Sequence, residues 1–257
     1  MKYPILLVHG VGIKNLKFIK AFGNIEKYLK TEGFIVYTST QDGFGTIENN
    51  AKQLKEQIIE ILSKENVDKI NLIAHSKGGL DSKYMIENLD MQDKIASLTT
   101  LCTPFKGSII ASLLFKLPNF VKKYLAFILN TTYKIFKDKN PDALKVCEEL
   151  QKHNCIEKET LHVHNSIYCQ SYSSTLKHKR DDFLMGIPLF FSRFYEEESS
   201  DGLVSRDSSK FENYRGDCID DSISHIEIVD FMAKKKKKEK IYGFYLDLCK
   251  DLENHGL

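Results

Sequence analysis

The 257 residues of the chain suit one large α/β domain or two small ones. Hydrophobic residues make up 42% and charged residues 28%, which is normal for a protein that folds around a sizeable core. The net charge of +2 is too small to indicate a nucleic-acid partner, so we expect none. No apolar stretch approaches the roughly 18–20 residues of a spanning helix, so no transmembrane segment is expected.

The first residues lack the pattern of a secretory signal, which combines a basic start, a longer apolar stretch and a small-residue cleavage site. We therefore expect a cytoplasmic protein, with a mature secreted form as the open alternative. The six cysteines are scattered, with no CxxC pair and no metal-ligand spacing. This distribution favours reduced, mostly buried thiols.

Strands and helices alternate through the first 110 residues. Short apolar runs predict strands over 3–8, 34–37, 69–74 and 95–101. Helical spacing of apolar residues predicts helices from Phe18 to Leu29, from Ile47 to Ile61, and through Tyr84 and Ile86, with Gly33 ending the first and Thr46 capping the second. Short connections between such elements imply right-handed crossovers. The predicted fold is therefore a mainly parallel, twisted sheet flanked by helices.

A helical insertion interrupts this alternation at about residues 109–160. Residues 109–136 are apolar with interspersed lysines and predict amphipathic helices, and Pro141 is placed in the first turn of a further helix that reaches Leu150. The sheet resumes at residues 166–172, and a final helix is predicted over 240–252. We expect a single domain over 1–257 with this insertion as a lid or cap.

Residues 74–78, Ala-His-Ser-Lys-Gly, lie between a predicted strand and a predicted helix. They differ from the GxSxG nucleophile elbow only in the alanine at the first position. The elbow needs a sharp turn flanked by very small side chains, and Ala74 and Gly78 satisfy that need. The sequence therefore predicts Ser76 as a nucleophile, against the alternative of a solvated serine in a tight turn.

A backbone oxyanion hole is predicted beside this serine. The charge that develops on a carbonyl oxygen during acyl transfer needs preorganised donors. At an elbow these are the amide after the nucleophile, here Lys77, and one amide from the loop after an early strand. That loop is His9-Gly10-Val11-Gly12, in which Val11 is the predicted donor. His9 is expected to be a structural histidine bonded within the loop.

The base and its acid are expected after the nucleophile, in the order Ser, Asp or Glu, His. Among eight histidines, His225 is favoured because it lies in a loop before the apolar residues 226–231. Asp201 lies in a turn followed by Gly202 and suits the acid that orients the imidazole. Spacing alone does not separate it from the other carboxylates of this region, which are Asp207, Asp217, Asp220, Asp221 and the run Glu196-Glu197-Glu198.

These motifs together resemble the bacterial triacylglycerol lipase family, whose members have the α/β-hydrolase fold. Residues 3–10 are similar to its first strand and oxyanion loop, and residues 71–80 to its nucleophile elbow in the Ala-first version of Bacillus lipases. Residues 103–108 are similar to its TPHxGS segment. Residues 201–204 match its DGLV acid motif, and residues 224–227 are similar to its NHLD base motif. The resemblance implies a catalytic triad of Ser76, Asp201 and His225.

The resemblance also implies that the insertion carries a lid. Its apolar residues are Leu113, Leu114, Leu117, Phe120, Val121, Leu125, Phe127 and Ile128. We expect them to line an acyl-chain site and to open at a lipid surface, with Leu113, Leu117 and Phe120 as substrate contacts. A permanently closed cap with an ordinary core face is the alternative.

Two departures from the family concern metal binding and location. Glu227 stands where many relatives have a calcium-binding Asp, and Asp181 or Asp182 could supply a second oxygen ligand. Calcium takes six to eight oxygens, so no metal ligand and no cofactor is assigned, and a structural calcium stays the open alternative. The family's disulfide and secretion signal have no evident equivalent. The basic run Lys234–Lys238 is expected to be a solvated loop or helix start, with attraction to anionic headgroups as the alternative.

The sequence thus predicts a carboxylic ester hydrolase, an acylglycerol lipase or a carboxylesterase, which acts on an ester or lipid substrate through an acyl-enzyme. A thioesterase or phospholipase would share the same three residues. A non-catalytic binding protein on a hydrolase scaffold is the alternative from another class, and the intact Ser, Asp and His argue against it.

Overall fold

The computed structural model describes residues 1–12, 14–16, 19–151, 166–196 and 199–257. Within these ranges, six parallel strands form one sheet in the order β2-β1-β3-β4-β5-β6. The strands are β1 (Ile5–Val8), β2 (Val36–Thr38), β3 (Ile70–His75), β4 (Ile95–Leu101), β5 (Tyr168–Ser173) and β6 (Tyr214–Asp217). The predicted mainly parallel sheet is confirmed.

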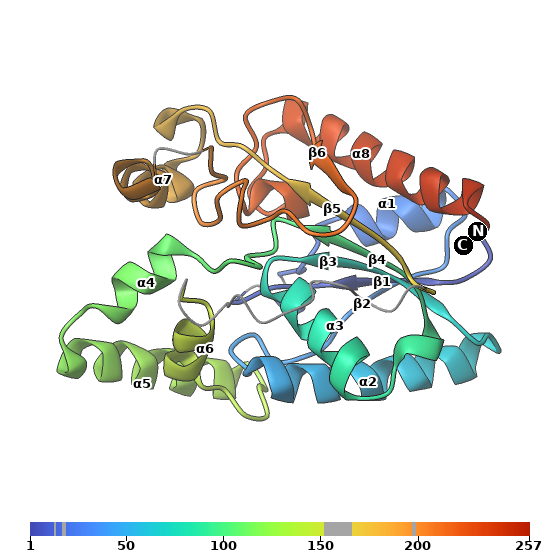
Figure 1. Ribbon diagram of the computed structural model, residues 1–257, viewed down its shortest axis with the longest axis horizontal. Helices are drawn as coiled ribbons and strands as arrows, with labels where there is room; N and C mark the ends of the chain where they lie inside the picture. The colour runs from blue at the N-terminus through green and yellow to red at the C-terminus, as the bar shows by residue number, and fades with distance from the viewer. Residues whose placement is uncertain (13, 17–18, 152–165, 197–198) are drawn as a thin grey trace.

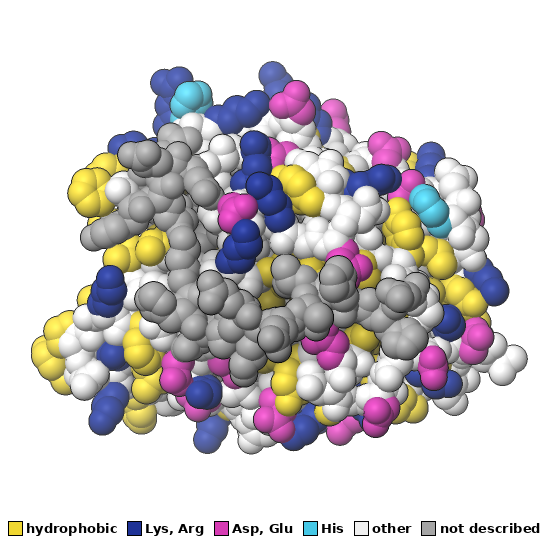
Figure 2. Space-filling view, in the orientation of Figure 1, with side chains coloured by type: hydrophobic (Ala, Val, Ile, Leu, Met, Phe, Trp, Pro, Cys, Tyr) yellow, Lys and Arg dark blue, Asp and Glu magenta, His cyan; other side chains and the backbone are white. Residues whose placement is uncertain are grey.

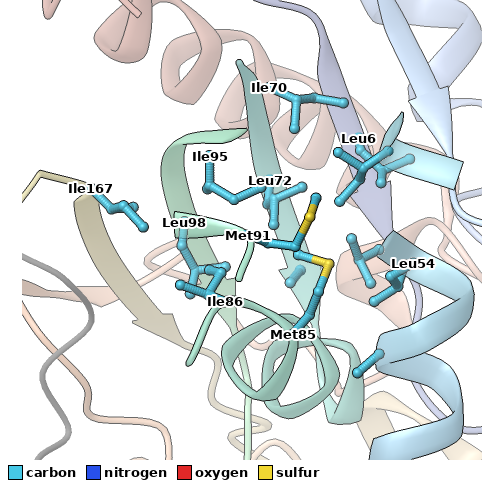
Figure 3. Packing of buried hydrophobic residues seen from close by; sticks show 14 of the residues in the cluster. Leu6, Leu54, Ile70, Leu72, Met85, Ile86, Met91, Ile95, Leu98 and Ile167 are labelled. Atoms are coloured by element: carbon cyan, nitrogen blue, oxygen red, sulfur yellow. The ribbon is translucent and has the colours of Figure 1, made fainter. Parts of the chain in front are cut away.

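Helices cover both faces of the sheet (Figure 1). On one face, α2 (Ile47–Glu65) and α3 (Lys77–Asn88) pack against strand residues such as Leu6 and Leu72. Figure 3 shows these two leucines beside Leu54 of α2 and Met85 of α3. Because side chains alternate along a strand, the neighbours of Leu6 point to the other face, where α1 (Ile25–Thr31) and α8 (Lys235–Asn254) cover them.

Four further helices lie together at one end of the molecule, beyond the carboxyl ends of the strands (Figure 1). They are α4 (Ile109–Phe115), α5 (Asn119–Ile135), α6 (Ala143–Glu149) and α7 (Phe183–Glu196). The first three lie within the residues that were expected to form a helical insertion. The end of the predicted insertion, residues 152–160, lies outside the described residues. The chain termini lie together at the opposite end, where Lys2 N donates to Leu257 O at 3.0 Å.

Local sequence signals explain some of the helix ends, and others differ from the prediction. The Thr46 hydroxyl accepts a hydrogen bond from Asn49 N at 3.3 Å and so caps α2, as predicted. Gly33 follows α1 with a φ of +94°. The predicted start of α1 at Phe18 is wrong, because the helix begins at Ile25. Pro141 is also not in the first turn of α6: the Asp142 carboxylate caps that helix, which begins at Ala143.

Two elements were not predicted from the sequence. Helix α7 contains Gly186 and Pro188, which both disfavour helix in isolation. Strand β6, Tyr-Arg-Gly-Asp, is a short, polar strand at the edge of the sheet. The apolar stretch 226–231 contains a short 3-10 turn, η3 (Glu227–Val229), and two other such turns are η1 (Gln92–Lys94) and η2 (Lys179–Asp181).

No helix among the described residues combines the length and the apolar character needed to cross a bilayer. The five cysteines in the described part of the chain are free thiols, as expected. Cys155 lies outside the described residues, as do His153, His162 and His164.

Candidate active site

Ser76 lies at the sharp turn between β3 and α3, and its backbone has a φ of +55° and a ψ of −132°. Positive φ is rare for a residue with a side chain, and such strain persists only where the surroundings enforce it. Here Ser76 N donates to Leu101 O of the neighbouring strand at 2.9 Å. The side chain is thereby held above the carboxyl edge of the sheet.

Glycines allow the segments around this turn to approach closely. A Cβ on Gly78 would lie 2.5 Å from His9 O, and a Cβ on Gly10 would lie 2.7 Å from Ser76 Cβ. Both distances are far shorter than any van der Waals contact. The small residues that predicted an elbow are therefore required by the contact between the turn and the loop after β1.

His225 lies between Ser76 and Asp201 in a continuous hydrogen-bonded line. Its Nε2 is 2.9 Å from Ser76 Oγ, and its Nδ1 is 2.6 Å from Asp201 Oδ2. The carboxylate oxygen can only accept, so Nδ1 carries the proton and the lone pair of Nε2 faces the hydroxyl. Asp201 and His225 are buried, while Ser76 is half-buried. The three predicted side chains thus meet at one edge of the sheet.

A tight turn fixes the Asp201 carboxylate. Its Oδ1 accepts from Leu203 N at 2.9 Å and from Val204 N at 2.8 Å. Gly202 turns the chain with a φ of +110°. The backbone of Asp201 also accepts from His225 N at 3.0 Å. Asp201 and His225 are therefore joined through both main chain and side chain.

The other carboxylates considered for this role lie elsewhere. Asp207 pairs with Lys106 at 2.7 Å, and Asp217 pairs with Arg206 at 2.6 Å. The remaining aspartates pair with lysines, Asp220 with Lys177 and Asp221 with Lys240. Residues 197 and 198 lie outside the described residues.

His75 was missed as part of this site. Its Nε2 is 2.9 Å from His225 O, and the two rings are 4.6 Å apart. A carbonyl can only accept, so His75 Nε2 donates to the main chain of His225. Burial, followed by the proximity of His225, lowers the pKa of His75 well below its ordinary value. A neutral His75 therefore supports the main chain of the His225 loop through this hydrogen bond. The one sequence signal for this role was its position next to Ser76.

The loop after β1 faces Ser76. Val11 lines the same cavity as Ser76 and His225. Lys77 begins α3, so its amide belongs to the unsatisfied N-terminal donors of a helix. Within the described part of the chain, neither the Val11 amide nor the Lys77 amide has a hydrogen-bond acceptor. Two backbone donors are thus available beside the hydroxyl.

His9 holds this loop in shape. Its Nδ1 donates to Gly10 O at 2.9 Å, and its carbonyl accepts from Gln41 Nε2 at 2.9 Å. Burial lowers the pKa of His9 to about 4, so the ring is neutral at neutral pH. It lies beneath the loop as a structural histidine.

An apolar cavity of about 280 Å³ opens beside Ser76. Phe44, Leu203 and the cap helices form its walls, with contributions from Ile110, Ala111, Leu114, Leu117, Leu125, Ala126, Leu129, Val146 and Leu150. Of the three predicted substrate contacts, Leu117 lines this cavity. Leu113 and Phe120 are not among its described wall residues, and 76% of the surface of Phe120 is exposed.

The residues considered for calcium do not fit a divalent ion. The Glu227 carboxylate already has a cation, because Lys237 Nζ lies 2.5 Å from its Oε2. Asp181 accepts from the Ser222 hydroxyl and Asp182 from the Ser224 hydroxyl, each at 2.5 Å. Among the described residues, one group of potential metal ligands is compact, Cys102, Asp201 and His225. Two of its members are the hydrogen-bonded acid and base.

Comparisons with known proteins agree with this geometry. Residues 4–174 match the family model described as palmitoyl protein thioesterase. Triacylglycerol lipase 2 of Saccharomyces cerevisiae is 30% identical over 270 residues, which cover 94% of this chain and 76% of the yeast protein. A triacylglycerol lipase of Pseudomonas fragi is 24% identical over 296 residues, with 100% of this chain and 98% of that protein covered.

A solved lipase has the same fold. The crystal structure of Staphylococcus hyicus lipase superimposes with a TM-score of 0.75 at 14% identity, over 98% of this chain and 95% of that one. At this identity the likeness concerns the fold alone, which is that of the α/β-hydrolases. The family match and the yeast relative add the chemistry of ester hydrolysis. The chain therefore belongs to the lipases of the α/β-hydrolase fold, within the family described by the palmitoyl protein thioesterase model, and it is a carboxylic ester hydrolase.

Proposed function

We propose that the chain hydrolyses acylglycerol esters through an acyl-enzyme on Ser76. The observation that carries this proposal is the hydrogen-bonded line from Ser76 through His225 to Asp201 at the mouth of an apolar cavity. Each group has the environment its role requires. The hydroxyl is half-buried and faces the cavity, the imidazole has a free lone pair toward it, and the carboxylate is buried behind the imidazole.

In the first step, Ser76 Oγ attacks the ester carbonyl while His225 Nε2 takes its proton. Asp201 keeps the Nδ1 proton in place and stabilises the imidazolium that forms. The amides of Val11 and Lys77 donate to the carbonyl oxygen as it becomes negative. The intermediate then collapses, and Nε2 gives its proton to the leaving alcohol oxygen. In the second step His225 Nε2 takes a proton from a water, which attacks the acyl carbonyl. The intermediate then collapses, the acid leaves, and Nε2 returns its proton to Ser76 Oγ.

The cavity lining supports a long acyl chain as the substrate group. Its walls are almost entirely aliphatic and aromatic, so a fatty acyl chain would lose its contact with water there. The curated relatives named above are triacylglycerol lipases. Acylglycerols combine such chains with the ester bond that the proposed chemistry cleaves.

Exposed apolar side chains around the cavity support transient contact with a lipid surface. On α7, Phe183 is 85% exposed, and Ile187 and Phe190 follow it at spacings of four and three residues, which places them on one helix face. Helix α4, whose side chains line the cavity, packs against α7. Lys179 and Arg180 are exposed in η2, just before α7, and suit anionic headgroups. Figure 2 shows hydrophobic and basic side chains together at this end of the molecule.

Substitution of the nucleophile tests the proposal. Ser76→Ala should lower kcat on a soluble short-chain ester by about 10⁶-fold, because the attacking oxygen is lost. Asp201→Asn should lower kcat by about 10⁴-fold, because the amide favours the wrong imidazole tautomer. Folding of both variants is checked by circular dichroism. Activity of the Ser76→Ala variant near that of the wild type would refute the proposal.

Contact with a lipid surface has its own test. Activity on a long-chain ester should rise in a step at the solubility limit of the substrate. Replacement of Phe183 and Ile187 by serine should reduce that step and leave hydrolysis of a soluble ester unchanged. A smooth curve through the solubility limit for the wild type would show that the lipid surface plays no part.

Thioester hydrolysis is the second candidate function. The matching family model is described as palmitoyl protein thioesterase, and its match contains Ser76 and the described cap helices. A thioester would use the same serine, base and oxyanion donors. A panel of palmitoyl thioester, phospholipid and triacylglycerol substrates separates these activities. If kcat/KM is highest on the thioester, thioester hydrolysis replaces acylglycerol hydrolysis as the proposed function.

A further inference from the structure

A buried ion pair joins the loop after β1 to the end of the cap helix α5. Lys14 Nζ lies 2.5 Å from Asp138 Oδ1, and the two side chains are only 9% and 0% exposed. The residues are 124 positions apart. Isolated charges are expensive to bury, so each of these side chains depends on the other for its place in the structure.

Further bonds join these segments to each other and to the loop before α2. The Tyr133 hydroxyl, in the last turn of α5, donates to Gly12 O, one residue beyond Val11. Asp138 Oδ2 accepts from Phe44 N at 3.0 Å, and Gly12 N donates to Gly43 O at 3.0 Å. Gly12 itself has a φ of +79°, so the loop turns at the residue that Tyr133 holds.

The rest of the cap is held differently. Asp42 accepts from Lys139 N at 2.8 Å and from Asn140 N at 2.7 Å, so the link between α5 and α6 is also fixed to the loop before α2. The opposite end of α5 is exposed at Phe120 and Tyr124, which are 76% and 65% accessible. The cap therefore has one end bonded to the core loops and one end directed to solvent.

We propose that Lys14, Asp138 and Tyr133 form a clamp through which the cap positions the oxyanion loop, so that these three are positioning residues for the reaction. This inference rests on the proposed function, in which the Val11 amide stabilises the oxyanion. A backbone donor is effective only when it is held within a few tenths of an ångström of the developing charge. The clamp bonds are made at Gly12 and Lys14, one and three residues after Val11, and they restrain the loop from outside.

The clamp is tested by kinetics of the full chain on a soluble short-chain ester. Asp138→Asn keeps the size of the side chain and removes its charge. It should lower kcat by about 30- to 100-fold, approaching the loss of one oxyanion donor, and change KM less than about threefold. Tyr133→Phe removes a single hydroxyl and should lower kcat about 10-fold with little change in Tm, which keeps the test valid if Asp138→Asn folds poorly.

A double variant separates positioning from plain stabilisation. Adding Lys14→Met to Asp138→Asn removes the unpaired buried ammonium, so Tm should return toward the wild-type value. The bond from Tyr133 to Gly12 is then the one remaining clamp contact, so kcat should stay low. Asp207→Asn, which breaks the exposed pair with Lys106, is the matched control and should leave kcat unchanged.

The outcomes also distinguish this inference from the proposed function. If Ser76→Ala is inactive while Asp138→Asn and Tyr133→Phe keep kcat within twofold of the wild type, the clamp is refuted and the proposed function stands. Recovery of kcat together with Tm in the double variant also refutes the clamp. If Ser76→Ala keeps its activity, the proposed function fails first.

Discussion

Close packing, backbone hydrogen bonds and two neutral histidines hold the side chains of the site in place. Ser76 sits in a backbone conformation that costs about 1–3 kcal/mol and is retained by close packing against Gly10 and Gly78. Asp201 Oδ1 is bonded to two backbone amides, so only its Oδ2 is directed at the imidazole. His75 and His9 are neutral because they are buried. In the proposed mechanism, little rearrangement is then needed before proton transfer.

His75 gives a prediction at the scale of a single residue. His75→Ala should lower kcat about 10-fold with KM unchanged, because His225 O loses its donor and the base is less well oriented. His75→Gln keeps an amide near the position of Nε2 and should retain most of the activity. Steady-state kinetics on a soluble ester measure both. Equal losses in the two variants would indicate that the ring is needed only for packing.

The sequence predicts Ser76 from the local geometry of its elbow motif, whereas the assignment of Asp201 and His225 depends on the resemblance of their short motifs to those of the lipase family. It does not predict the role of His75, since the direction of a side chain beside the nucleophile depends on where a loop 150 positions later returns. Lys14 and Asp138 are unpredictable for the same reason. Their pairing is a product of tertiary structure.

The contact between α3 and the loop after β1 yields a prediction for Gly78, with a glycine of α8 as its control. Gly78→Ala should lower the free energy of unfolding by about 1–3 kcal/mol and also lower kcat, because the new Cβ would press on His9 O at 2.5 Å. Gly243→Ala in α8 is the matched control. No atom lies within 4 Å of its added Cβ, so it should raise stability by about 0.5–1 kcal/mol. Urea unfolding measures both, and a stable, fully active Gly78→Ala would contradict the packing described.

The N-terminal turn of α8 gives a second prediction at this scale. Lys237 neutralises the buried Glu227, which also accepts from Ser224 N at 3.1 Å next to His225. Lys237→Met should therefore cost about 3–5 kcal/mol of stability and lower kcat, since it leaves a buried charge unpaired. Lys236→Met, in the same basic run but exposed, should change stability by less than about 0.5 kcal/mol.

A chelator provides the complementary measurement. Because a lysine already satisfies Glu227, dialysis against EDTA should leave the kcat of the wild type unchanged. Loss of activity on dialysis, restored by added calcium, would contradict this account of the His225 loop.

At the level of elements, the spacing of apolar residues predicts the central strands and the helices on both faces. Each of these segments has either a continuous apolar run or a clear helical spacing. Helix α7 was not predicted because Gly186 and Pro188 have low helix propensity, and the helix is evident only in the folded chain. Strand β6 is too short and polar to give a strand signal, and it forms by pairing with β5.

The buried histidines determine how the whole molecule responds to pH. The folded pKa of His9 is about 4 and that of His75 is well below 6.5, so the unfolded chain binds more protons as pH falls through 6.5. These two histidines make their full contribution to the free energy of unfolding above that pH, and the contribution is lost on acidification. Burial raises the pKa of Asp81 to about 6 and also raises that of Glu149, and both carboxyls act in the opposite direction and offset part of this loss.

Stability should therefore fall by about 2–3 kcal/mol between pH 7.5 and pH 5. In the His9→Asn variant the fall should be smaller by about 2 kcal/mol, because that residue no longer titrates. Urea unfolding at the two pH values gives the comparison. An identical pH dependence in the variant and the wild type would show that His9 is not the source.

Covalent labelling by a fluorophosphonate tests most directly whether distant parts of the chain assemble one reactive serine. The wild type should take up one equivalent of probe, and peptide mapping should place the adduct on Ser76. Labelling should be absent in Ser76→Ala and strongly slowed in His225→Ala. A wild-type protein that stays unlabelled, or an adduct on another serine, would contradict the assignment of this site.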